Sequence, residues 1–152
     1  DGRFNQAPII TMLPVIRLKR NLTSNIRINV ADNDLDPYRC LWSTTWIECG
    51  GICMQVPNTT VLNPSTCMLR FTPVKLGYYA IALTVADYES TSSVTSFSRV
   101  PIQFLFKVWD SNDSCVVPPL YLGDVPPDEC IYIEPGEVRV MRILIRVRCP
   151  NA

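Results

Sequence analysis

Residues 77–87, which read Gly-Tyr-Tyr-Ala-Ile-Ala-Leu-Thr-Val-Ala-Asp, carry the strongest strand signal in the chain. Large apolar side chains recur at every second position from Tyr79 to Val85, a period of two that is typical of a half-buried β-strand. Apart from Tyr78, the intervening positions hold only alanine and threonine, so the second face is small and weakly apolar. We therefore expect this strand to lie centrally in a sheet.

Further segments show the same alternation, and no segment shows a convincing helical period. Pro14 cannot donate to a strand ladder, so the first segment is expected at a sheet edge or at a change of sheet. Residues 43–66 are the least regular, and residues 88–99 resemble a long polar loop. An antiparallel Greek-key Ig-like sandwich is the fold class typical of such spacing. The strands are expected near residues 9–18, 25–30, 38–42, 46–47, 52–56, 67–72, 77–87 and 100–109.

The chain has 152 residues, enough for one domain and a fragment of another. We interpret residues 1–8 as a linker and residues 9–112 as the sandwich domain. Residues 113–152 are the start or a fragment of a second β domain, because so short a segment cannot bury a full sandwich core. Its strands are expected near residues 120–122, 131–133 and 138–147.

The amino-acid composition narrows the classes of function that are expected. The apolar fraction is 47%, the charged fraction is 18% and the formal net charge is +0, so broad binding of nucleic acid is not expected. No apolar run has the roughly 20 residues of a membrane span, so direct membrane insertion is not expected either. Histidine is absent, which removes the commonest general base and argues against an enzyme. The simplest account is a piece of a longer secreted or membrane-anchored protein.

Cysteines and sequons indicate an oxidising, extracellular compartment. The chain has seven cysteines and lacks a Cys-x-x-Cys pair, so disulfides are favoured over a metal site. Three N-glycosylation sequons begin at Asn21, Asn58 and Asn112, each beside turn residues where a glycan could point into water. The chain is therefore expected to be a secreted or cell-surface glycoprotein.

Four cysteines in the first domain allow three connectivities. We favour Cys40–Cys67, because both positions face inward, together with Cys49–Cys53, which would close a small loop. The alternative pairs Cys40 or Cys67 with a loop cysteine.

Three further cysteines lie in the second unit. Cys115 and Cys130 are expected to pair with each other. Cys149 is then left over, and it could form an intermolecular disulfide or pair beyond residue 152.

Four segments combine strand alternation with acidic or aromatic residues at fixed positions. They are Ile26-x-Ile-x-Val-Ala-Asp32-x-Asp34, Asp34-x-Asp36-x-Tyr38-x-x-x-Trp42, residues 77–87, and Ile102-x-Phe-x-Phe-x-Val108-x-Asp110-x-Asn112-Asp113 followed by Pro118. In this order they resemble the cadherin and PKD-type Ig-like repeats of animal surface or mucin-like proteins, over about residues 7–119. The resemblance implies cell adhesion and a calcium site at the junction with a following domain.

The candidate calcium ligands are oxygens, which calcium prefers in sets of six to eight. The alternative, which we favour, is that these side chains only build Asx turns and end the strands. The candidate residues are Asp32, Asp34, Asp36, Asp110, Asn112 and Asp113.

The function expected is a non-enzymatic module for cell adhesion or receptor–ligand protein binding. Its contacts would come from strand edges, from residues 88–99 and from residues 43–66, where Trp46 and Ile47 form a candidate binding loop. Its partner would be another protein or a second copy of the chain. The alternative is a structural spacer of a matrix or coat, self-associating through disulfides or strand edges.

Overall fold

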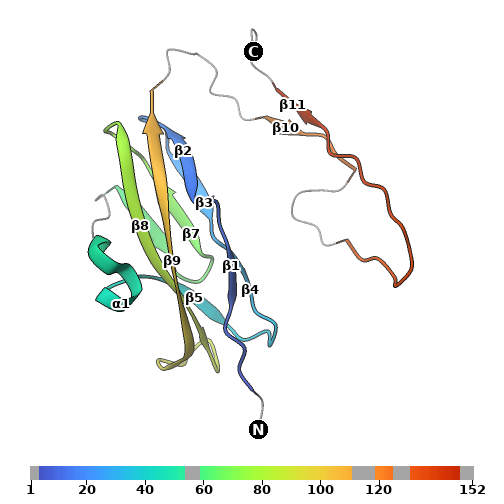
Figure 1. Ribbon diagram of the computed structural model, residues 1–152, viewed down its shortest axis with the longest axis horizontal. Helices are drawn as coiled ribbons and strands as arrows, with labels where there is room; N and C mark the ends of the chain where they lie inside the picture. The colour runs from blue at the N-terminus through green and yellow to red at the C-terminus, as the bar shows by residue number, and fades with distance from the viewer. Residues whose placement is uncertain (1–3, 54–58, 111–118, 125–130, 148–152) are drawn as a thin grey trace. The chain divides into compact units, whose positions relative to one another are not determined.

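A computed structural model describes residues 4–53, 59–110, 119–124 and 131–147 (Figure 1). The chain divides into two compact units, Asp1–Asp110 and Ser111–Ala152. The described residues are mostly β-strands, with one short α-helix and one 3-10 turn, so the all-β class is confirmed. No helix among them has the length and apolar character that crossing a membrane requires.

Two larger sheets form the first unit. The four-stranded sheet has the order β2-β9-β8-β5, and the three-stranded sheet has the order β3-β7-β6. A third, two-stranded sheet consists of β1 and β4. In the chain β4 follows β3 after the single residue Ile28, whose N–H donates to the Cys67 carbonyl at 2.9 Å. The strands are β1 (Ile9–Thr11), β2 (Val15–Lys19), β3 (Ser24–Arg27), β4 (Asn29–Ala31), β5 (Tyr38–Trp42), β6 (Thr60–Asn63), β7 (Met68–Phe71), β8 (Gly77–Tyr88) and β9 (Ser96–Trp109).

Pro14 marks a change of sheet, as its missing N–H predicts. β1 pairs antiparallel with β4, whereas β2 pairs parallel with β9. The Pro14 carbonyl accepts from the Leu105 N–H at 2.9 Å and so continues the ladder up to the switch. The expected antiparallel arrangement is therefore wrong for this one edge strand.

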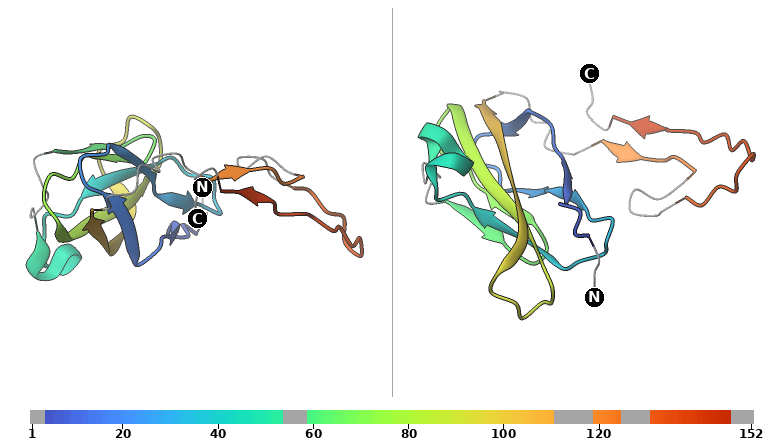
Figure 2. Two further views of the ribbon diagram at one scale, coloured as in Figure 1. Left: turned by 90° about the horizontal axis from the view of Figure 1, so that it is seen from above. Right: turned by 60° about the horizontal axis from the view of Figure 1, so that its bottom comes forward.

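β8 lies between β5 and β9, as the alternation in residues 77–87 predicts. Its inner side chains meet the other sheet in one core, where the Phe71 ring stacks on the Phe106 ring at 5.3 Å between centroids. From Ile81 to Tyr88 the outer face is buried too. Helix α1 (Trp46–Cys49) provides the cover, since it packs beside β8 and β9 (Figures 1 and 2).

Two expectations for the first unit are corrected. Residues 46–52 form α1 and the 3-10 turn η1 (Gly50–Ile52), not strands, because a four-residue helix carries no periodic signal. β9 begins at Ser96, so the loop over residues 88–99 is shorter than expected. Pro101 is tolerated in β9 because β2 pairs with this strand only from Leu105 onward, which leaves a free edge beside the proline.

The second unit has few paired residues in its described part. β10 (Leu120–Tyr121) and β11 (Ile145–Arg146) pair antiparallel. The strand expected across residues 138–147 is confined to β11, and residues 131–133 are not a strand. A two-stranded ribbon offers little to pack against, so its apolar side chains stay exposed, including Val138 at 90% and Ile143 at 74%.

The Asp87 carboxylate holds the amino-terminal segment and the β8–β9 hairpin together. It is fully buried, and it accepts from Asn5 Nδ2 at 2.9 Å, from the Ser98 N–H at 2.6 Å and from Ser98 Oγ at 2.8 Å. The segment expected to be a linker therefore contacts the domain through Asn5. Burial by itself would raise the pKa of Asp87, but the donated hydrogen bonds outweigh it and lower that pKa below 3.8.

Asp87 is expected to make stability depend on acid pH. Because its pKa is lowered in the folded state, the carboxylate stabilises the fold above its ordinary pKa, and this contribution is lost as pH falls through the folded-state pKa. Asp87→Asn should cost about 1–3 kcal/mol at neutral pH and flatten this acid dependence. Urea unfolding across acid pH measures both effects. Glu89→Gln, at an exposed carboxyl nearby, is the control, and equal pH profiles for the two variants would contradict the assignment.

Candidate protein-binding site

Helix α1 is a local structure that needs support. Four residues cannot form a stable isolated helix. Thr45 precedes the helix in extended conformation, and its carbonyl accepts the Glu48 and Cys49 N–H groups at 3.0 and 3.1 Å. Gly50 ends the helix at φ 55°, a left-handed region that favours glycine. A disulfide between Cys49 and Cys53 then closes the turn.

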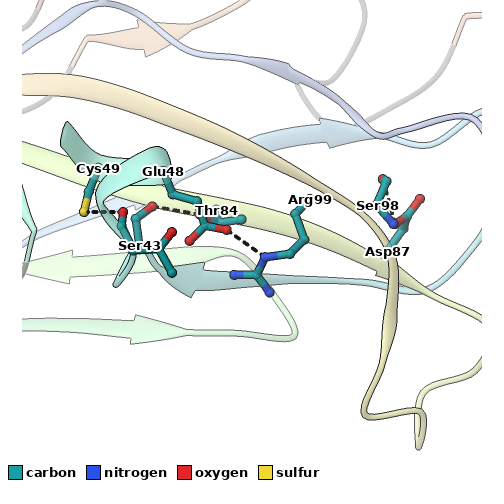
Figure 3. A network of polar contacts seen from close by, with 8 residues as sticks. Ser43, Glu48, Cys49, Thr84, Asp87, Ser98 and Arg99 are labelled. Carbon is teal, nitrogen blue, oxygen red and sulfur yellow. Dashed lines mark hydrogen bonds and ion pairs between the residues drawn. The ribbon is translucent and has the colours of Figure 1, made fainter.

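The buried side of α1 is tied to the four-stranded sheet by polar contacts (Figure 3). Glu48 Oε1 accepts from Arg99 Nε at 2.7 Å, and the Glu48 carbonyl accepts from Gln103 Nε2 at 3.4 Å. The Arg99 hydrogen bond lowers the pKa of Glu48 and, reciprocally, raises the pKa of Arg99. Beside them the Ser43 and Thr84 hydroxyls share a buried hydrogen bond of 2.8 Å.

The outer side of α1 is apolar and unprotected. Trp46 is 74% exposed and Ile47 is 93% exposed, although Glu48 and Cys49 in the same turn are buried. Single exposed apolar residues are common, but an adjacent tryptophan and isoleucine on an anchored helix resemble the aromatic anchors that dominate protein interfaces. The candidate binding loop predicted from the sequence is therefore a short helix, and contacts of its Glu48 with Arg99 and Gln103 of β9 hold it on the sheet.

The contacts of Glu48 with Arg99 and Gln103, which anchor α1 on the sheet, were not predicted from the sequence. Arg99 and Gln103 lie 51 and 55 positions after Glu48 in the sequence. The only local signal is that Arg99 and Gln103 occupy alternate outward positions of a strand. Their pairing with α1 depends on the tertiary fold.

Cys40 and Cys67 form a disulfide with a Cα–Cα distance of 5.2 Å, and Cys49 and Cys53 form the second. This is the connectivity favoured from the sequence. Cys40 lies on β5 and Cys67 directly precedes β7, so the first bridge joins the two larger sheets. Cys115, Cys130 and Cys149 lie outside the described residues.

The acidic candidates separate into two places. One carboxylate oxygen from each of Asp32, Asp34 and Asp36 lies within 4.8 Å of the others. Asp32 Oδ1 accepts the N–H groups of Asp34 and Asp36 at 3.0 and 3.1 Å, which is an Asx turn. Asp110 pairs instead with Arg20.

The Asx turn holds Asp34 and Asp36 beside Asp32. Three carboxylates supply part of the six to eight oxygens that calcium takes, and Asp110 is not in this group. Calcium binding here stays a prediction. Asn112 and Asp113 lie outside the described residues.

Of the three sequons, the one at Asn21 falls within the described residues. Asn21 is exposed at φ 61°, and its N–H donates to the Pro73 carbonyl at 2.7 Å. The exposure of Asn21 is compatible with a glycan at this position, which stays a prediction. Asn58 and Asn112 lie outside the described residues.

An open groove of about 430 Å³ lies at the Pro14 sheet switch. Its wall is mostly apolar, and among the described residues that line it there is no His, Asp, Glu, Lys, Tyr or Cys, the usual general acids and bases. It is lined by Thr11, Met12, Leu13, Ile16, Ile26, Arg27 and Asn29.

The described residues thus define a disulfide-bonded, sandwich-like all-β domain with an exposed helical tip. No family model and no curated protein matches the chain. A proposed alpha-galactosidase from Bacteroides fragilis is similar in structure, with 13% identity, a TM-score of 0.50, and coverage of 70% of this chain and 18% of that one. The GspB Siglec domain shares 13% identity at a TM-score of 0.38, with 70% and 59% covered. The chain spans less than two thirds of either, and the first likeness supports a common fold alone.

Proposed function

We propose that this chain is a non-enzymatic extracellular module that binds proteins in cell adhesion or receptor–ligand recognition. The observation that carries the proposal is the pair Trp46 and Ile47, 74% and 93% exposed on an anchored helix. Two intramolecular disulfides are compatible with an oxidising compartment, and the exposed Asn21 sequon fits a surface glycoprotein. The Greek-key topology of cadherin and PKD-type repeats is part of this proposal.

The contacts that anchor α1 on the sheet make Trp46 and Ile47 suited to binding. Ordering a flexible loop costs free energy on association, whereas a loop that is already ordered leaves more of the contact energy as affinity. The Cys49–Cys53 disulfide and the Glu48–Arg99 ion pair hold α1 before any partner arrives. A tryptophan presented in this way can insert into a pocket of a partner at low entropic cost.

Binding should depend on the α1 tip. Trp46→Ala combined with Ile47→Ser is expected to weaken partner binding at least about tenfold, as loss of an aromatic hot spot does. The measurement is quantitative retention of extracellular proteins from the native tissue, followed by affinity measurement on each retained partner. Val94→Ala, at a 94% exposed valine in the β8–β9 loop, is the matched control.

Equal affinities for the tip variant and the Val94 variant would overturn the proposed site. Arg99→Ala gives a second check, because it removes the support of α1 and leaves the tip residues unchanged. It should weaken binding by less than the tip variant does. A partner whose affinity is unchanged by both the tip variant and the Arg99 variant binds at another site.

A structural spacer that self-associates is the second candidate function. The observation that favours it is the exposed apolar segment before and within β11, with Ile143 at 74% and Ile145 at 63%. Exposed apolar residues beside unpaired strand edges favour contact with another chain. Concentration-dependent sedimentation that Ile143→Glu abolishes would support the spacer and not the recognition module.

A further inference from the structure

The outer face of the four-stranded sheet has an uncovered half in which cations and aromatic rings form rows. The register places Arg17 beside Lys107 and Lys107 beside Tyr78, across β2, β9 and β8. One step along, Lys19 lies beside Trp109. Side chains at these positions point away from the core, because the alternate positions Ile16, Leu18, Phe106 and Val108 pack within it.

Helix α1 covers only the other half of this face. Its Glu48 contacts reach Arg99, Gln103 and Thr84. Beyond them Tyr78 is 63% exposed and Trp109 is 42% exposed, and Arg17 is exposed as well. We call this uncovered half the basic-aromatic face and define it by Arg17, Lys19, Tyr78, Lys107 and Trp109.

Among the described strand positions of this face, the charged side chains are all basic. The outward positions of β2, β8 and β9 hold no acidic residue from Val15 to Lys19, from Tyr78 to Ala86 or from Arg99 to Trp109. Arg17 and Lys107 enter none of the ion pairs among the described residues, and Lys107 Nζ instead lies 5.6 Å from the Tyr78 ring centroid. Like charges on directly opposed strand positions destabilise a sheet. The chain as a whole is neutral, so this concentration is local.

We infer that the basic-aromatic face binds a sulfated polysaccharide. Arginine and lysine form charge-assisted hydrogen bonds with sulfate oxygens, and a bound polyanion would remove the repulsion between Arg17 and Lys107. The rings of Tyr78 and Trp109 present apolar surface with a polar edge, which suits the apolar face of a sugar ring. Neighbouring strands lie about 4.8 Å apart and alternate residues of one strand about 6.6 Å apart, so the backbone sets these cations in a regular array. Such an array suits a ligand whose anionic groups repeat along its length.

An acidic polypeptide fits this face less well. A peptide that adds to a sheet does so at a strand edge through main-chain hydrogen bonds, whereas these residues lie on the flat face. Protein interfaces also hold few lysines, and here Lys107 lies between Arg17 and Tyr78 in the row across the strands. The α1 tip is a separate site, so this inference does not depend on the proposed function.

The test is binding of the full chain to immobilised heparin at increasing salt. Binding is expected to weaken as salt rises. Arg17→Ser combined with Lys107→Ser should weaken it at least about tenfold, since two charge-assisted contacts are lost. Tyr78→Ala should also weaken binding. Thermal unfolding of the double variant should occur at the same temperature or higher, because the variant removes repulsion within the sheet.

Arg27→Ser combined with Arg70→Ser is the matched control, since it changes the net charge equally on the other sheet. Equal loss for the two double variants would mean that overall charge decides, and it would overturn the inference. No retention on heparin, or equal retention on desulfated heparin, would overturn it too. Equally tight binding of polyglutamate with the same variant dependence would assign the face to an acidic polypeptide. The Trp46 variant should retain heparin binding, which keeps this test separate from that of the α1 tip.

Discussion

Replacing Cys40 and Cys67 together by alanine is expected to lower the free energy of unfolding by about 3–4 kcal/mol. The bridge closes a segment with a sequence separation of 27, so it restricts the unfolded chain substantially. Both cysteines are buried, with exposures of 0% for Cys40 and 1% for Cys67, and their disulfide links the two larger sheets. The double variant therefore loses the covalent link between the two sheets and retains the Cys49–Cys53 disulfide.

Denaturant unfolding of the oxidised protein measures this loss. The control is Cys49→Ala with Cys53→Ala, where the sequence separation is 4. That shorter loop should cost about 2 kcal/mol, because loop-closure entropy grows only with the logarithm of loop length. A loss for the Cys40 variant no greater than that of the control would show that the bridge does not hold the layers together.

Phe106→Ala is expected to cost about 3–5 kcal/mol. The Phe106 side chain is fully buried, and its ring centroid lies 5.3 Å from that of Phe71 and 5.4 Å from that of Phe104. Phe71 belongs to the opposite sheet, so truncation opens a cavity where the two layers meet. The cost combines lost burial with a cavity that the strands on either side cannot close.

The measurement is equilibrium urea unfolding, compared with Phe97→Ala at a phenylalanine that is 54% exposed. The Phe97 variant should stay within about 0.5 kcal/mol of the parent protein, as surface substitutions usually do. A Phe106 variant that unfolds at the same urea concentration as the Phe97 variant would contradict the assignment of the core.

Alternation was enough to predict most of the core strands. The segment at Tyr38–Trp42 is a strand with the expected bounds, and the inward set of β9 is buried from Phe104 to Val108 as its period predicts. A period of two gives each residue a face without reference to any distant part of the chain. The Pro14 switch was predictable for a similar reason, because a missing N–H is a local property.

Which strands pair with each other, and that α1 covers part of the outer sheet face, were not predictable from the sequence. The strand β6 has a short and weak pattern, and α1 has only four residues, so neither carries a period that can be counted. The parallel β2–β9 pairing depends on where the chain returns after Pro14. Of the candidate site residues, Trp46 and Ile47 were identified by their irregular segment, whereas the supporting Glu48–Arg99 pair was not.

The sequence by itself determined which side chains face inward, because the two-residue period of a strand assigns each residue to a face. It also determined which residues could be exposed anchors. Only the tertiary structure decided which strands became neighbours, that Arg99 and Gln103 hold α1, and that Arg17, Lys107 and Tyr78 form one row. Many of these contacts join residues that are distant in the sequence, such as Glu48 and Arg99 with a separation of 51. Their formation depends on the burial of both sheets together, so no single segment determines it.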